Sequence, residues 1–149
     1  MRESAKASAI FQTAHDLFQQ QGCHKTTIRQ IASGAQVSLG LINHLFHSKA
    51  DLAFHVLNML MQYSLDRVAE DVDEKNDPML FASASTRLSF HFLFEGPYRR
   101  FYLECLEDDV FFRALSGLEN TSIYRIAGQY GIEKNDDLFL LYGKFLPYN

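Results

Sequence analysis

The start of the chain carries apolar residues at the spacing of a helix face. They recur at intervals of three or four positions and stop before Gly22, and glycine is the residue that commonly follows the end of a helix. The residues on this face are Ile10, Phe11, Ala14, Leu17 and Phe18. We therefore predict a first amphipathic helix that ends at Gly22.

Two shorter helices, separated by a tight turn, are predicted to follow. Thr27 and Gln30 have the spacing of a capping box, in which each side chain bonds the other residue's free backbone N–H. The turn covers residues 34–37, and Ser38 is a favourable N-cap for the third helix. The residues expected to face inward are Ile28, Ile31, Ala32, Val37, Ile42, Leu45 and Phe46. Three short helices with this turn make a helix-turn-helix.

The remainder of the chain is also predicted to be helical. A further cap pattern at residues 48–51 opens a long fourth helix, and a polar run at 71–77 follows it. Residues 79–95 contain alternating Phe90, Phe92 and Phe94, which also fit a buried strand, but no nearby segment offers a partner strand. We therefore predict a helix there, buried on all sides. Further helices are expected at 98–106, 109–116, 119–130 and 136–146. The predicted fold class is all-α, a three-helix head followed by a helical body.

A helix-turn-helix places its last helix in the major groove of DNA, with the N-terminal side chains facing base edges. The inward residues of the third helix leave an outward set, namely Leu39, Leu41, Asn43, His44 and His47. Gly40 is unusual in a short helix, where glycine costs about 1 kcal/mol relative to alanine. Either a sugar-phosphate strand comes close to its backbone, or Gly40 packs against the first helix.

The distribution of charge supports a nucleic-acid partner for the head alone. The whole chain has a net charge of −4, which argues against such a partner. Residues 1–49, however, hold five Lys or Arg and two acids, giving +3, whereas residues 50–149 hold nine bases and sixteen acids, giving −7. A basic head on an acidic body is expected of a protein that binds DNA through one end, although +3 also suits a plain surface.

Composition and motifs exclude several other classes. Two distant cysteines, Cys23 and Cys105, do not form a disulfide scaffold, and we expect a reducing, cytoplasmic location. No apolar run is long enough for a membrane span, and the N-terminus does not read as a signal peptide. The common motifs of hydrolases, zinc peptidases and phosphate-binding loops are missing, so we expect no enzyme and no cofactor. His44 and His47 have helical spacing but no carboxylate or cysteine beside them, so no metal is expected.

Three ordered motifs resemble one family. Thr27-Ile-Arg-Gln-Ile-Ala32, Val37-Ser-x-Gly40 and Phe46-x-Ser-Lys49-x-x-Leu52 look like the N-terminal domain of TetR-family transcriptional repressors, over roughly residues 8–55. The resemblance implies a DNA-binding domain at 1–48 and a ligand-binding and dimerisation domain at 49–149. It also implies a homodimer on a palindromic operator, released by a small-molecule effector. Because the chain is shorter than usual for the family, we expect its dimerisation helices to be missing or reduced.

The resemblance assigns the DNA contacts. Thr27 and Ser38 stand at helix N-termini, whose free N–H groups favour phosphate. Arg29 and Lys49 supply charges for the backbone, and the outward side chains of the third helix would read bases. The complete expected set is Thr27, Arg29, Ser38, Leu39, Gly40, Leu41, Asn43, His44, His47 and Lys49.

Two departures from the family pattern keep an alternative open. Gln36 stands in the turn where the family usually has glycine, and Asn43 stands where it often has tyrosine. Asn43 is suited to reading adenine, whereas leucines would contact thymine methyl groups. The alternative is an interaction protein that keeps the fold but has lost operator binding.

An effector is expected among the aromatic residues of the body. Polar side chains within that interior would orient an apolar ligand. The residues assigned to this pocket are Arg87, His91, Phe94, Phe101, Tyr102 and Phe111.

Overall fold

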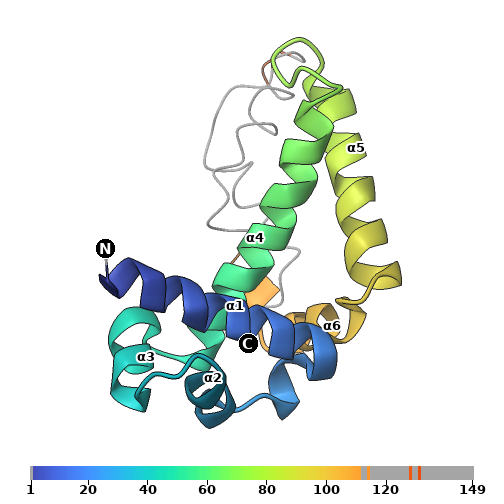
Figure 1. Ribbon diagram of the computed structural model, residues 1–149. Helices are drawn as coiled ribbons and strands as arrows, with labels where there is room; N and C mark the ends of the chain where they lie inside the picture. The colour runs from blue at the N-terminus through green and yellow to red at the C-terminus, as the bar shows by residue number, and fades with distance from the viewer. Residues whose placement is uncertain (1, 112–113, 115–127, 129–130, 132–149) are drawn as a thin grey trace.

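The computed structural model describes residues 2–111, 114, 128 and 131. Its N-terminal part contains α1 (Arg2–Lys25), α2 (Ile28–Gly34) and α3 (Leu39–Phe46). The long helix α4 (Lys49–Ala69) leaves this head, and α5 (Pro78–Phe90) returns beside it. A π-helical turn, η1 (His91–Glu95), then leads into α6 (Arg99–Glu107), which packs against α1 (Figure 1). The described part of the chain is all-helical, which confirms the predicted fold class.

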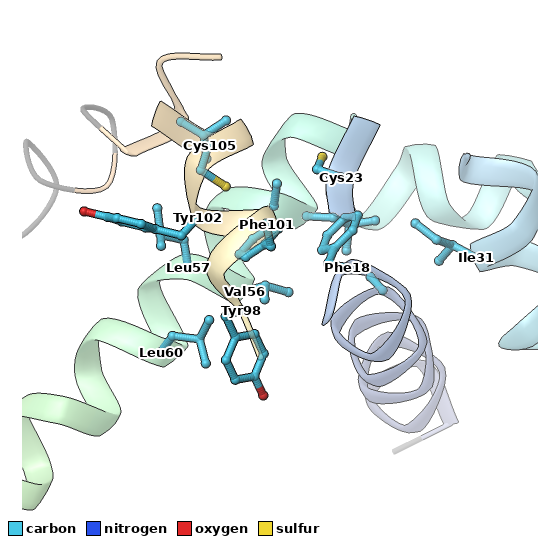
Figure 2. Close-up of a cluster of buried hydrophobic side chains, with 14 of the residues drawn as sticks. Phe18, Cys23, Ile31, Val56, Leu57, Leu60, Tyr98, Phe101, Tyr102 and Cys105 are labelled. Atoms are coloured by element: carbon cyan, nitrogen blue, oxygen red, sulfur yellow. The ribbon is translucent and has the colours of Figure 1, made fainter. Parts of the chain in front are cut away.

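The hydrophobic core is continuous from the head into the body. Ile31 of α2 and Ile42 of α3 pack in the same cluster as Val56 of α4. At its centre, the rings of Phe18 and Phe101 stack with centroids 5.2 Å apart, which joins α1 to α6 (Figure 2). Burial of a side chain of this size contributes about 1.5–3 kcal/mol. The position of α6 on α1 is therefore set largely by apolar packing.

The end of α1 differs in one respect from the prediction. Gly22 does leave the helical conformation, with φ 83° and ψ 173°, but helical residues resume after it and continue to Lys25. The positive φ explains the glycine, because other residues adopt it only at a cost. Gly22 is therefore a break within α1 and not its last boundary.

The prediction for residues 79–95 is right about the helix and wrong about its burial. Phe90 is 48% exposed, because α5 packs on α4 through only one face, which carries Phe81 and Ser85. Phe90 instead stacks on Phe94, one turn away. The helix predicted at 98–106 is α6. Residues 110, 111, 114 and 128 are helical, and Asp109 lies in a turn with φ 58°. The other residues predicted at 109–116, 119–130 and 136–146 lie outside the described residues.

Candidate nucleic-acid interface

The helix α2 begins with the predicted capping box. Thr27 Oγ1 accepts a hydrogen bond from the Gln30 backbone N–H at 3.2 Å, and the Thr27 N–H donates to Gln30 Oε1 at 2.8 Å. Two N–H groups without intrahelical partners are thereby satisfied. Thr27 and Arg29 are both exposed at this end of the helix. The local sequence therefore fixes where α2 starts and leaves both side chains open to solvent.

The turn after α2 is a Schellman motif. The Gln36 N–H donates to Ser33 O at 3.2 Å, and the Val37 N–H donates to Ala32 O at 3.0 Å. Gln36 takes the left-handed conformation, with φ 55°, as expected if the family's glycine position is filled by another residue. Gly34 is glycine for a different reason, since a Cβ there would lie 2.6 Å from Thr13 Cγ2 of α1. Glycine is thus used for helix packing and not for the left-handed turn.

The helix α3 presents most of its expected outward face. Ser38 Oγ accepts from the Leu41 N–H at 3.3 Å and caps the helix, while Ile42 is fully buried. Leu39 is 41% exposed. The other exposed residues on this helix and its C-cap are Gly40, Asn43, His44 and His47, and the inward residues Val37, Leu45 and Phe46 are half-buried against the core.

The structure corrects the expectation for Leu41 of α3 and decides between the two explanations of Gly40. Leu41 is half-buried and packs against the core, so the expectation that it faces fully outward is wrong. A helix of eight residues that packs on both α1 and α4 leaves only a narrow outward stripe. A Cβ on Gly40 would meet no atom within 4 Å. Packing against the first helix therefore does not explain Gly40.

Lys49 opens α4 and binds the end of α1. Its Nζ donates to Cys23 O at 2.8 Å and to Thr26 O at 3.0 Å, and the residue is half-buried. A cation at a helix C-terminus is favourable because the last carbonyl groups carry partial negative charge. The prediction that Lys49 is in the first turn of the fourth helix is confirmed, but these two carbonyl partners were not foreseen. Asp51 completes the same turn, since its N–H donates to Ser48 Oγ at 3.0 Å.

The break in α1 is also bound from the side of the body. The His24 N–H donates to Glu104 Oε2 at 2.9 Å, and His24 Nε2 lies 2.8 Å from Asp108 Oδ2. Glu104 belongs to α6, and Asp108 is the residue that follows the end of this helix. Sequence reasoning missed both residues, because neither belongs to a motif and both lie far from His24 along the chain.

The charges of Lys49, Glu104 and Asp108 all act on the pKa of the Cys23 thiol. Burial raises the pKa of Cys23 to about 11, Lys49 lowers it, and Glu104 and Asp108 raise it. Burial also raises the pKa of Cys105, on the facing side of α6 (Figure 2). Both cysteines are buried free thiols. They are therefore poor nucleophiles at neutral pH.

Of the six residues assigned to an effector pocket, the four aromatic ones lie in one cluster, and Arg87 and His91 lie outside it. Phe101 and Tyr102 are buried core residues, and Tyr102 makes edge-to-face contacts with Phe94 and Phe111, with centroids 4.8 and 5.3 Å apart. Arg87 is exposed, and the His91 side chain is 67% exposed beside Glu95. The expectation that Arg87 and His91 lie inside the aromatic interior is wrong, because both project from the side of α5 and η1 away from the core.

Neither a metal site nor a membrane span is found among the described residues. No three His, Cys, Asp or Glu side chains of that part of the chain are grouped so that they could hold a metal. His44 Nε2 lies 3.8 Å from Glu3 Oε1 in an exposed pair. Among the helices of the described part, none has the length and apolar character needed to cross a bilayer.

Comparison with known proteins identifies the head. Residues 10–56 match the family model of bacterial regulatory proteins of the tetR family, from Ile10 in α1 to Val56 in α4. No curated protein and no solved structure matches the chain. The matched segment contains the whole helix-turn-helix described above, including its caps, its turn and α3. The N-terminal domain therefore belongs to the tetR family of bacterial regulatory proteins, and it is the DNA-binding domain of a transcriptional regulator.

Proposed function

We propose that the protein is a ligand-responsive repressor whose homodimer binds a palindromic DNA operator. The observation that carries this proposal is the exposed stripe of α3, which presents Leu39, Asn43 and His44 beside an open backbone at Gly40. In a helix-turn-helix this stripe enters the major groove, where Asn43 reads adenine and Leu39 contacts thymine methyl groups. Leu41 is assigned to the edge of this surface, because half of it is taken up by the core.

The backbone contacts of this proposal surround the stripe. Arg29 is exposed on α2 and supplies a fixed charge, and Thr27 and Ser38 stand beside the N–H groups that open α2 and α3. Lys49 has three N–H donors and uses two of them on carbonyl oxygens, so one remains for a phosphate. His47 completes the exposed surface at the end of α3.

Binding to a random duplex at several salt concentrations tests the DNA-binding function. Phosphate contacts release counterions, so affinity should fall steeply as salt rises. Arg29→Ala should weaken binding to all duplexes alike and flatten the slope of log affinity against log salt by about one unit. Arg67→Ala is the matched control, since Arg67 is an exposed arginine near the far end of α4.

The outcome separates the proposal from its alternative. A wild-type protein that binds no duplex at low salt would be an interaction protein that keeps the fold without operator binding. If Arg29→Ala and Arg67→Ala change the slope equally, the measured binding is a general charge effect and not a contact of the head.

The effector part of the proposal is supported by the contact between α4 and α5. Asn58 Oδ1 and Ser85 Oγ are buried and have no hydrogen-bond partner among the described residues. Buried polar atoms without partners cost free energy that a polar group of a ligand would recover. Phe94 of η1, which is half-buried and packs edge-to-face on Tyr102, supplies apolar surface in the body. We therefore propose a small apolar effector with one polar group.

A thermal-shift screen of apolar compounds tests this part. A ligand at one hundred times its Kd should stabilise the protein by about 2.7 kcal/mol. Ser85→Ala should leave the unliganded protein as stable or slightly more stable, because it removes a buried unpaired hydroxyl. The same variant should reduce the shift by a hit compound. If every compound leaves the melting temperature unchanged, or if Ser85→Ala responds like wild type, this site is not the effector site.

A further inference from the structure

The break in α1 is recognised by a carboxylate from the body. Gly22 turns the chain out of the helical conformation, so the backbone groups after it leave the helix ladder. The His24 N–H is bonded instead to Glu104 Oε2 at 2.9 Å. A Cβ on Gly22 would lie 2.5–2.8 Å from the carboxylate of Glu104. Glycine is therefore needed here twice, for its positive φ and for the close approach of Glu104.

The same short segment of α1 is bound from the head side by Lys49. Its Nζ donates hydrogen bonds to Cys23 O and Thr26 O, which lie on either side of His24 in the sequence. The segment is also tied internally, because Thr26 is fully buried and its Oγ1 donates to Gly22 O at 2.6 Å. The carbonyl oxygens that hold Lys49 and the N–H that holds Glu104 thus belong to one stretch of backbone, residues 22–26. We call this stretch the α1 joint.

We propose that Glu104 is a positioning residue for DNA binding. By holding the His24 N–H it fixes the α1 joint, and the joint fixes the two carbonyl oxygens that orient the Lys49 ammonium at the start of α4. This inference rests on the proposed DNA-binding function, in which the third donor of Lys49 binds a phosphate. It links a body residue to the DNA surface through backbone atoms, without a direct contact between Glu104 and Lys49.

A double-mutant cycle measured on a random duplex tests the link. Loss of a hydrogen bond to a charged group costs about 1.5–3 kcal/mol, so Glu104→Ala and Lys49→Ala should each weaken binding roughly tenfold or more. The double variant should bind the duplex as tightly as the single variant with the lower affinity, because both changes remove the same oriented contact. Both single variants should also flatten the salt slope, which a change in stability alone would not do in folded protein.

Two further variants provide rescue and control. Glu104→Gln keeps an oxygen that accepts from the His24 N–H and should bind DNA nearly as well as wild type. Glu107→Ala removes an exposed carboxylate from the same helix and should leave the affinity unchanged. Circular dichroism at the binding temperature selects folded samples for the comparison.

The outcomes distinguish this inference from the function on which it rests. If wild type binds no duplex, the proposed function fails and the role of Glu104 in DNA binding fails with it. If wild type binds and Glu104→Ala binds equally well, or if the effects of Glu104→Ala and Lys49→Ala add, only the positioning role is overturned. Equal losses in Glu104→Ala and Glu107→Ala would also overturn it, since they would reflect net charge.

Discussion

Gln36 occupies a position in the turn of the helix-turn-helix where the backbone itself favours glycine. Its φ of 55° closes the Schellman motif after α2, and the adjoining N–H groups of Gln36 and Val37 are both bonded. The left-handed conformation costs a residue with a Cβ roughly 1–2 kcal/mol, and glycine avoids that cost. The turn is therefore held in place by its hydrogen bonds and by the packing of α2 and α3, against the preference of its own residue.

Gln36→Gly should stabilise the protein by about 0.5–1 kcal/mol, because relief of the positive φ outweighs the greater entropy of glycine in the unfolded chain. Urea denaturation would measure the change. The same substitution at Gln20, an exposed residue within α1, should have the opposite sign and cost about 1 kcal/mol. Destabilisation by both substitutions would contradict the strain assigned to Gln36.

At the scale of elements, α1 and α6 enclose two buried thiols. Burial raises the pKa of Cys23 from its ordinary value of 9.0 to about 11, and it raises the pKa of Cys105 as well. Both thiols should therefore stay protonated at about pH 8 and react with iodoacetamide only as the protein unfolds. The labelling rate should rise with urea in step with the loss of helical signal. Rapid labelling of native protein would show that the α1–α6 contact opens without global unfolding.

The same shifts set a dependence of stability on pH. Because the folded state holds these protons more tightly than the unfolded state, the stabilisation is complete below the unfolded pKa and is lost as pH rises from about 9 toward 11. Thermal unfolding across this range would show the loss. A Cys23→Ala/Cys105→Ala variant should lose less stability over the same interval. An identical pH profile for the two proteins would assign the loss to other groups.

The elements also show how far sequence reasoning reaches. The capping box at Thr27, the cap at Ser38 and the turn at Gln36 were predictable, because each depends on residues within five positions of one another. The partners of Lys49 and Glu104 were not predictable, because they are backbone groups far away along the chain. Those of Lys49 are 26 and 23 residues away, and that of Glu104 is 80 residues away. A backbone carbonyl or N–H has no signature in the sequence.

The error in the body has a different physical origin. A run of apolar residues predicts a helix but does not say how many of its faces another helix will cover. The helix α5 packs on α4 through one face, so Phe90 and Arg87 remain outside while Ser85 is buried. Arg87 and His91 lie close to the aromatic residues along the sequence, but half a turn of helix is enough to separate an interior position from an exposed one.

At the scale of the molecule, the head and the body are joined by one core. Apolar packing through Phe18 and Phe101 and the bonds at the α1 joint connect α6 to the DNA-binding helices. A small displacement of α6 would therefore act on the head as a whole, since packed cores respond by shifting elements and not by deforming continuously. This continuity supports the proposal that an effector in the body alters DNA binding. A head joined to the body only by a flexible linker would not respond in this way.

The last prediction concerns the symmetry of the DNA site. A head with a net charge of +3 over residues 1–49 makes few phosphate contacts, so one copy should bind weakly and two linked copies much more tightly. A two-fold dimer requires a palindromic site, with half-sites separated by about one helical turn or a multiple of it. Leu39 and Asn43 on each exposed stripe should favour thymine and adenine at the contacted positions.

Selection of bound sequences from a random duplex pool, together with sedimentation of the complex, tests this symmetry. We expect an enriched A/T-rich palindrome bound by two copies of the chain. Asn43→Ala should relax the preference at one position in each half-site and cost about 1–3 kcal/mol per half-site. Gln12→Ala is the matched control, because it removes an exposed amide of α1 that is paired with Asp16, and it should leave the enriched sequence unchanged.

An enriched site without two-fold symmetry, or a complex with one copy, would refute the dimer. A motif unchanged by Asn43→Ala would remove that residue from base reading while leaving the dimer intact, because the symmetry of the site depends on the pairing of heads and not on any single base contact.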